Sequence, residues 1–112
     1  MITGNKIRRA HRVGDIQIHP FNSSQLGPNS YDVRLGPEMY KIDKNIILLE
    51  GESLKDKAMK VEPIDGKFLF NPKYFYLGHT IEAVGSESYV PMYEGRSTLG
   101  RLGVATHITA GF

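Results

Sequence analysis

Residues 27–36 read GPNSYDVRLG and join a turn-forming sequence to a run in which apolar and polar residues alternate. Alternation with a period of two predicts a β-strand, with Tyr31, Val33 and Leu35 on one face and Asp32 and Arg34 on the other. Pairing of Asp32 with Arg34, at the surface or at a subunit contact, would account for the polar face. The segment therefore predicts a strand that has one buried side and follows a tight turn.

Short runs of the same kind recur along the chain. They predict strands at residues 16–18, 31–35, 39–42, 46–49, 67–70, 74–81, 89–93 and 104–108. Turn-forming residues separate these runs, at Gly27-Pro28-Asn29, Gly36-Pro37, Asp65-Gly66, Asn71-Pro72 and Gly85-Ser86. Many short strands at close spacing predict an all-β protein, either a barrel or a jelly roll, in a single domain over residues 1–112.

One helix is expected, at the start of the chain. Thr3 is placed to cap a helix that runs to about Arg12 and ends at Gly14. Its inner side would carry three apolar residues, Ile2, Ile7 and Ala10.

The composition limits the class of protein. Fourteen Lys and Arg against 12 Asp and Glu leave a formal charge of +2, which is too small to indicate a partner that is a nucleic-acid polymer. The absence of cysteine excludes disulfides and thiolate metal sites and favours an intracellular, cytoplasmic protein. Basic residues interrupt the N-terminal segment, so we expect neither a signal peptide nor a membrane span.

Residues 94–103 read EGRSTLGRLG and are the second informative segment. Glycines let a backbone approach a ligand, Ser97 and Thr98 offer hydroxyl groups, and Arg96 and Arg101 offer cationic, fork-shaped donors. These groups together suit a polyphosphate. A glycine-rich turn with two solvated arginines explains the same residues equally well.

Three segments together resemble the deoxycytidine triphosphate deaminases. They are SYDVRLG at 30–36, GRSTLGRLG at 95–103 and HITAGF at 107–112, in that order. The related deoxyuridine triphosphatases share the first two segments in a looser form, and the resemblance extends from the opening helix to the last residue. It implies an all-β, dUTPase-like β-clip or distorted jelly roll with one short N-terminal helix. It also implies a homotrimer with active sites between subunits.

The resemblance also assigns roles by position. It implies a dCTP or dUTP ligand whose triphosphate is held by Arg96, Ser97 and Thr98, with Mg²⁺ bound through the phosphates. Ser97 and Arg101 would act around the cytosine ring as the catalytic residues present here. The full set of implied nucleotide-binding residues is Arg96, Ser97, Thr98, Leu99, Gly100, Arg101, Thr109 and Ala110, the last two forming a wall against the base and sugar.

A zinc-dependent deaminase is excluded by the residue types. That chemistry needs a His-x-Glu pair and a Pro-Cys-x-x-Cys segment, and this chain has neither. The four histidines show no metal-binding spacing, and His107 is best explained as a structural histidine. Without zinc, attack of water on C4 of cytosine needs a carboxylate as proton acceptor. Ser97 and Arg101 could orient the water but could not replace that base.

In the family, the catalytic glutamate lies on a strand beyond the Ala-Gly-Phe turn, and no Glu of residues 1–112 matches it. Glu94 precedes the phosphate-binding segment and occupies a different place. We therefore expect an incomplete chain of a dCTP deaminase that forms dUTP, with or without further hydrolysis to dUMP. The alternatives are a dUTP diphosphatase, a non-catalytic protein that binds nucleotide or a partner chain, and a fragment that folds only with its C-terminal part.

The 112-residue chain alone is expected to be nearly inactive. Loss of a general base typically lowers a rate by about two to four orders of magnitude. Ammonia release from dCTP and pyrophosphate release from dUTP, each with Mg²⁺, measure this. Turnover close to that of a full-length relative would show that another residue, such as Glu94 or Asp32, supplies the base.

Overall fold

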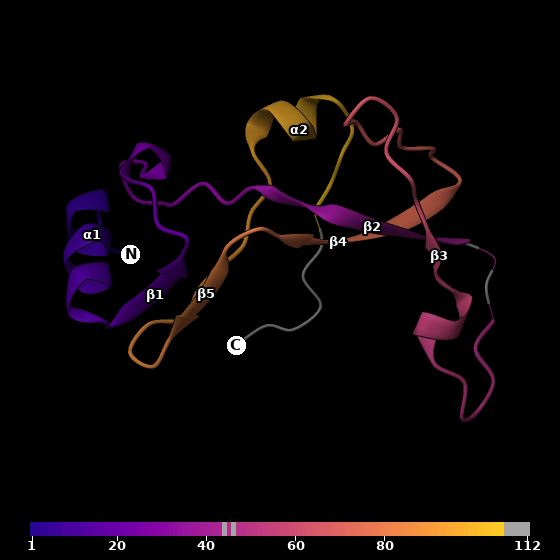
Figure 1. Cartoon of the computed structure of the whole chain (residues 1–112), viewed down its shortest axis with the longest axis horizontal. Helices are drawn as coiled ribbons and strands as arrows, with labels where there is room; N and C mark the ends of the chain where they lie inside the picture. Colours follow the sequence, from indigo (N-terminus) through magenta and orange to yellow (C-terminus); the bar gives the residue numbers. More distant parts are fainter. Residues whose placement is uncertain (44, 46, 107–112) are drawn as a thin grey trace. The chain divides into compact units, whose positions relative to one another are not determined.

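The computed structural model describes residues 1–43, 45 and 47–106 (Figure 1). The chain divides into two compact units, one formed by Met1–Tyr31 with Ala83–Phe112 and the other by Asp32–Glu82. Each unit contains an antiparallel sheet, and the longest helix is a single segment at the N-terminus. This confirms the all-β prediction. The sheets among the described residues have two and three strands and close no barrel.

In the first unit, helix α1 (Gly4–Val13) confirms the predicted opening helix. Ile7 and Ala10 are its buried residues. Gly14 ends the helix with φ of 87° and donates its N–H to the carbonyls of Ala10 and His11. Thr3 occupies the capping position, but its side chain makes no cap hydrogen bond; the Gly4 N–H instead reaches the Pro28 carbonyl, 2.7 Å away.

Strand β1 (Ile16–His19) pairs antiparallel with β5 (Ala83–Ser86) in the same unit, with Ile18 opposite Val84. Ile18 is buried against this pairing. The prediction of a turn at Gly85-Ser86 was wrong, because both residues lie within β5. Glycine and serine are tolerated there because β1 supplies the apolar partner and the backbone bonds. A 3₁₀ turn, η1 (Ser23–Gln25), follows β1.

The second unit is a three-stranded sheet in the order β3-β2-β4. Its strands are β2 (Leu35–Asp43), β3 (Met59–Lys60) and β4 (Tyr74–Thr80), and all pairings are antiparallel. Met39 and Ile42 of β2 are its buried apolar residues. A short 3₁₀ helix, η2 (Leu54–Lys57), precedes β3 and begins with a capping box made by Ser53 and Asp56.

Among the described residues, the strand predictions at 16–18, 39–42 and 74–81 were right, and most of the others were wrong. The run predicted at 31–35 becomes a strand only from Leu35, and the runs at 39–42 and 74–81 correspond to β2 and β4. Residues 47–49, 68–70, 89–93 and 104–106 form no strand. Apolar alternation in those segments therefore did not report pairing, because pairing also needs a free neighbouring strand.

A bulge interrupts the β2–β4 ladder at Gly36-Pro37. Leu35 and Met39 are four positions apart in β2, whereas their partners Thr80 and Gly78 are two positions apart in β4. Proline has no N–H to give to a ladder and is tolerated at such a site. Gly36 is buried directly beneath the imidazole of His79, where a Cβ atom would clash with the ring.

The start and end of the second unit are joined by Arg34 and Glu82. The Arg34 backbone N–H and its Nε–H donate to the two carboxylate oxygens of Glu82, at 2.8 and 2.7 Å. The Arg34 carbonyl accepts from the Ile81 N–H at 2.9 Å. The Glu82 side chain is fully buried, whereas the Arg34 side chain is half exposed. The predicted polar face of this strand thus carries an arginine whose partner comes from the far end of the unit.

A second α-helix, α2 (Ser97–Arg101), was not predicted. It ends in a Schellman motif: the Gly103 N–H bonds to the Gly100 carbonyl at 3.0 Å, and the Val104 N–H bonds to the Leu99 carbonyl at 2.9 Å. Gly103 has φ of 79°, a left-handed conformation that suits glycine. No helix in the described ranges is long and apolar enough to cross a membrane.

Replacing Glu82 should weaken the second unit. Glu82→Ala removes the acceptor of a buried backbone amide together with a charge-assisted bond, so the free energy of unfolding should fall by about 2 kcal/mol. Glu62→Ala, at an exposed carboxylate of the same unit, is the matched control and should change it by less than about 0.5 kcal/mol. Urea unfolding measures both variants. Equal effects of the two substitutions would contradict the role given to Glu82.

Two glycines of the α2 segment should respond to alanine in opposite directions. Gly103→Ala forces a Cβ into the left-handed region and should destabilise the helix end by about 1–2 kcal/mol. Gly100 lies within the helix, and no atom lies within 4 Å of the position that a Cβ would take, so Gly100→Ala should stabilise the helix by about 0.5–1 kcal/mol. Amide hydrogen exchange of Leu102 and Val104 reports both changes. Faster exchange in both variants would rule out this explanation.

Candidate functional site

Helix α2 carries the central part of the glycine-rich segment. Arg96 is its N-cap residue, with extended backbone angles, and Ser97 and Thr98 form its first two positions. The first hydrogen bond of the helix runs from the Gly100 N–H to the Arg96 carbonyl, so the amides of residues 97–99 precede the hydrogen-bonded ladder. All residues from 94 to 103 are exposed. The segment thus offers hydroxyl, amide and guanidinium donors on one short turn.

The helical spacing decides which of these side chains can act together. Ser97 and Arg101 are four residues apart in α2, and residues at this spacing lie on one face of a helix. Thr98 is three residues from Arg101 and lies beside the same face. The sequence alone could not show this, because it did not predict a helix here. The structure therefore brings together the two side chains to which the resemblance assigns the cytosine ring.

Two glycines of the segment have different surroundings. A Cβ atom on Gly95 would lie 3.0 Å from Oγ1 of Thr106 and 3.4 Å from its Cγ2, so the chain leaving the segment runs close beside its entry. Gly100 faces open space. Glycine is needed at 95 for this close approach, whereas at 100 it leaves the outer surface of α2 uncovered.

The donor set of residues 95–103 suits an anion and not a bare cation. The segment contains two arginines, a serine and a threonine, and no carboxylate or histidine. Elsewhere in the described residues, no three His, Asp or Glu side chains gather in an arrangement that could hold a metal ion. Such donors can bind and orient a phosphorylated ligand, but they offer no proton acceptor of the strength that deamination needs.

Six of the eight predicted nucleotide-binding residues lie together at α2: Arg96, Ser97, Thr98, Leu99, Gly100 and Arg101. The other two, Thr109 and Ala110, lie outside the described residues, as does His107. The sequence does contain a signal for α2. Gly103 follows the run at the position where helices commonly end on a left-handed glycine, and Arg101 lies in the last turn.

Comparisons with known proteins bear on the family of the chain. The family described as dCTP deaminase-like matches residues 1–112. A relative from Hathewaya histolytica named "dCTP deaminase, dUMP-forming" is 46% identical over 98 residues, covering 88% of this chain and 55% of the relative. Relatives of the same name from Leptospira biflexa and Clostridium botulinum are 39% and 40% identical, and each of these alignments covers the whole length of this chain.

The chain spans 55% to 63% of the length of these relatives. The match covers the opening helix, both sheets and α2, so it does not depend on the glycine-rich segment alone. The resemblance inferred from the three sequence segments is thereby confirmed: this chain belongs to the dCTP deaminase-like family.

Proposed function

We propose that this protein binds dCTP through helix α2, deaminates it without zinc and hydrolyses the product to dUMP. The observation that carries the proposal is the placement of Ser97 and Arg101 on one face of α2, directly after Arg96. The relatives' shared name, "dCTP deaminase, dUMP-forming", supports hydrolysis as a second step. The leading alternative, hydrolysis of dUTP alone, uses the same phosphate grip.

The triphosphate would lie at the start of α2. Arg96 supplies a planar pair of donors for phosphate oxygens, and the hydroxyls of Ser97 and Thr98 supply two more. The amides of residues 97–99 precede the helical ladder and add neutral donors. Because a Cβ atom on Gly95 would lie against the Thr106 side chain, the backbone at the entry to this turn passes close to the chain that leaves it.

Ser97 and Arg101 would then act at the base. A hydroxyl and a guanidinium on one helix face can hold a water molecule and stabilise negative charge developing at the pyrimidine. Neither group accepts a proton readily at neutral pH. The proton acceptor is expected from the glutamate that the family places beyond the Ala-Gly-Phe turn, and the wall beside the base is expected from Thr109 and Ala110.

Magnesium fits the site only through the ligand. Residues 95–103 contain cationic and hydroxyl groups but no carboxylates, so Mg²⁺ would bind phosphate oxygens and not the side chains of these residues. When bound there, it would neutralise phosphate charge during hydrolysis. Arg96, Ser97 and Thr98 would hold the remaining phosphate oxygens.

A homotrimer in the cytoplasm, with active sites between subunits, completes the proposal. The buried apolar residues among those described are few: Ile7, Ala10, Ile18, Met39 and Ile42. On the β2–β4 sheet, Tyr40 pairs with Leu77, and Phe75 lies two residues along on the same face; all three are exposed. An apolar sheet face of this kind is stabilised when another subunit covers it.

The Arg96→Ala variant tests whether α2 holds the phosphates. Loss of a charge-assisted phosphate contact should weaken binding by about 2–3 kcal/mol, which corresponds to a roughly 30- to 150-fold rise in the dissociation constant. Calorimetry with a dUTP analogue that resists hydrolysis measures binding. Ammonia, pyrophosphate and dUMP released from dCTP with Mg²⁺ measure turnover. Lys67→Ala, at an exposed cation of the other unit, is the control for lost charge.

The products separate the alternatives. Ammonia together with dUMP supports the proposal, and pyrophosphate from dUTP without ammonia from dCTP would leave only the diphosphatase. Unchanged affinity in Arg96→Ala would remove the phosphate role of α2, even if the protein proved active.

A further inference from the structure

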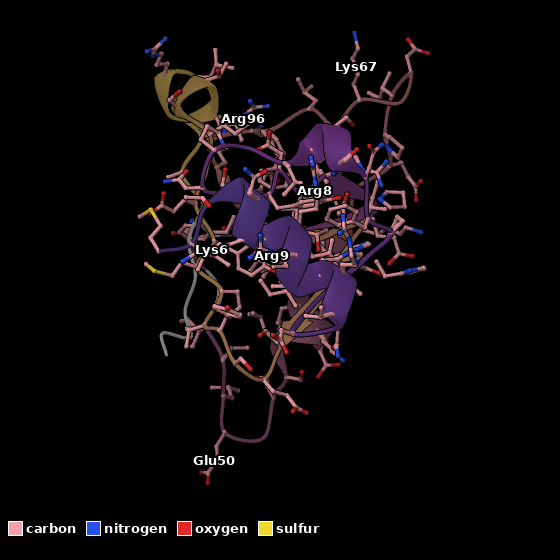
Figure 2. The ribbon with its side chains drawn as sticks, turned by 90° about the vertical axis from the view of Figure 1, so that its left-hand side faces the viewer. Lys6, Arg8, Arg9, Glu50, Lys67 and Arg96 are labelled. Atoms are coloured by element: carbon pink, nitrogen blue, oxygen red, sulfur yellow. The ribbon has the colours of Figure 1, made fainter. Side chains whose placement is uncertain are left out.

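Helix α1 has a strongly cationic outer side. It carries Lys6, Arg8, Arg9 and Arg12 and has no acidic residue from Gly4 to Val13. Figure 2 shows Lys6, Arg8 and Arg9 along this helix, on the side that faces the viewer. The buried residues Ile7 and Ala10 face inward, and all four cationic residues are exposed. The first acidic residue after the helix is Asp15, beyond the glycine that ends it.

These charges are not balanced within the described part of the chain. None of the four side chains forms an ion pair or hydrogen bond with another described residue. Arg8 and Arg12 are four residues apart, and like charges at this spacing destabilise a helix. The repulsion would be relieved if an anion from solution bound between them.

The same surface has two shallow hollows. A hollow of about 220 Å³ is lined by Asn5, Arg8, Arg9 and Arg12. An adjoining hollow of about 230 Å³ shares Asn5 and Arg8 and reaches Ser23 at η1. Neither hollow is lined by an acidic residue, and neither includes a residue of the α2 segment.

We propose that the Arg8–Arg9–Arg12 hollow of α1 is a second anion site, which binds a compact polyanion with two or three linked phosphates. Three guanidinium groups and an amide offer many donors within a small volume, and guanidinium forks match phosphate oxygens. The volume is below that of typical drug-sized ligand pockets, which suits a phosphate chain better than a whole nucleotide. The small formal charge of +2 and the short length of the cationic side of α1 argue against a nucleic-acid polymer, which needs a longer row of phosphate contacts.

The site is independent of the function proposed for α2. Inorganic tripolyphosphate and pyrophosphate are the ligands to use. Because Arg96 of α2 would also contact a phosphate chain, the binding that belongs to α1 is the binding that persists in the Arg96→Ala variant. Binding to the folded state alone should also raise the unfolding temperature as ligand is added.

The test compares three variants of the purified protein by calorimetry with tripolyphosphate and pyrophosphate at low ionic strength. The Arg8→Gln/Arg12→Gln variant should bind about tenfold more weakly or worse, since hydrogen bonds to charged groups are lost. Lys67→Gln/Lys73→Gln removes the same charge from exposed positions of the other unit and should bind as the unsubstituted protein does. Arg96→Ala should leave binding at α1 unchanged.

Arginine and glutamine have similar helix propensities, so the substituted helix should still form. Without ligand, the Arg8→Gln/Arg12→Gln variant should be at least as stable as the unsubstituted protein, because a like-charge pair is removed. Equal loss of binding in the lysine variant would overturn the proposal, since only net charge would then matter. So would unchanged affinity in the arginine variant, complete loss of binding in Arg96→Ala, or binding to single-stranded DNA without binding to tripolyphosphate.

Discussion

A buried carboxylate holds the second unit together. Glu82 has no exposed side-chain surface, so its charge must be satisfied inside the protein. Arg34 satisfies it from both its backbone amide and its guanidinium, and the Arg34 carbonyl in turn accepts from Ile81. These bonds fix the point at which β2 begins against the end of β4. The β2–β4 pairing, including the bulge at Gly36-Pro37, begins with the residues next to these bonds. An arginine half in water and a glutamate wholly out of it make a stable arrangement, because the more costly charge is the one that is fully bonded.

The parts of the fold that sequence could predict are those that local chemistry decides. The opening helix was predicted with its end at Gly14, because an apolar face and a left-handed glycine lie close together in the sequence. Strand β5 was not, because its four residues include glycine and serine and become a strand only opposite β1. Helix α2 was missed for the opposite reason: three glycines within residues 95–103 indicated a loop, whereas Gly103 in fact ends a helix. Partner strands far apart in sequence, and glycines with two possible roles, are what single-sequence reasoning could not resolve.

In the candidate site too, the sequence could identify the residues but not their arrangement in space. Arg96 to Arg101 are adjacent in sequence, so the motif could identify them without knowledge of the fold. What the motif could not give was their orientation, since only the helix places Ser97 and Arg101 on one face. The cationic side of α1 shows the reverse case. Its arginines were visible in the sequence as residues interrupting an apolar segment, but only the structure shows that three of them line one hollow and lack partners among the described residues.

The Arg34–Ile81 hydrogen bond also has a meaning for protein engineering. This backbone hydrogen bond joins the two ends of the second unit, close to where the chain enters the unit and where it leaves it, so the two ends are held together. Residues can be added within such a unit without altering the spacing of its ends, because the entropic cost of closing a loop rises only slowly with the length of the loop. The exposed connection around Gly51, between β2 and β3, is a suitable insertion site for a tag or a fluorescent reporter. Inserts of different lengths should then be tolerated there, because the hydrogen bond that joins the ends of the unit is the same in each.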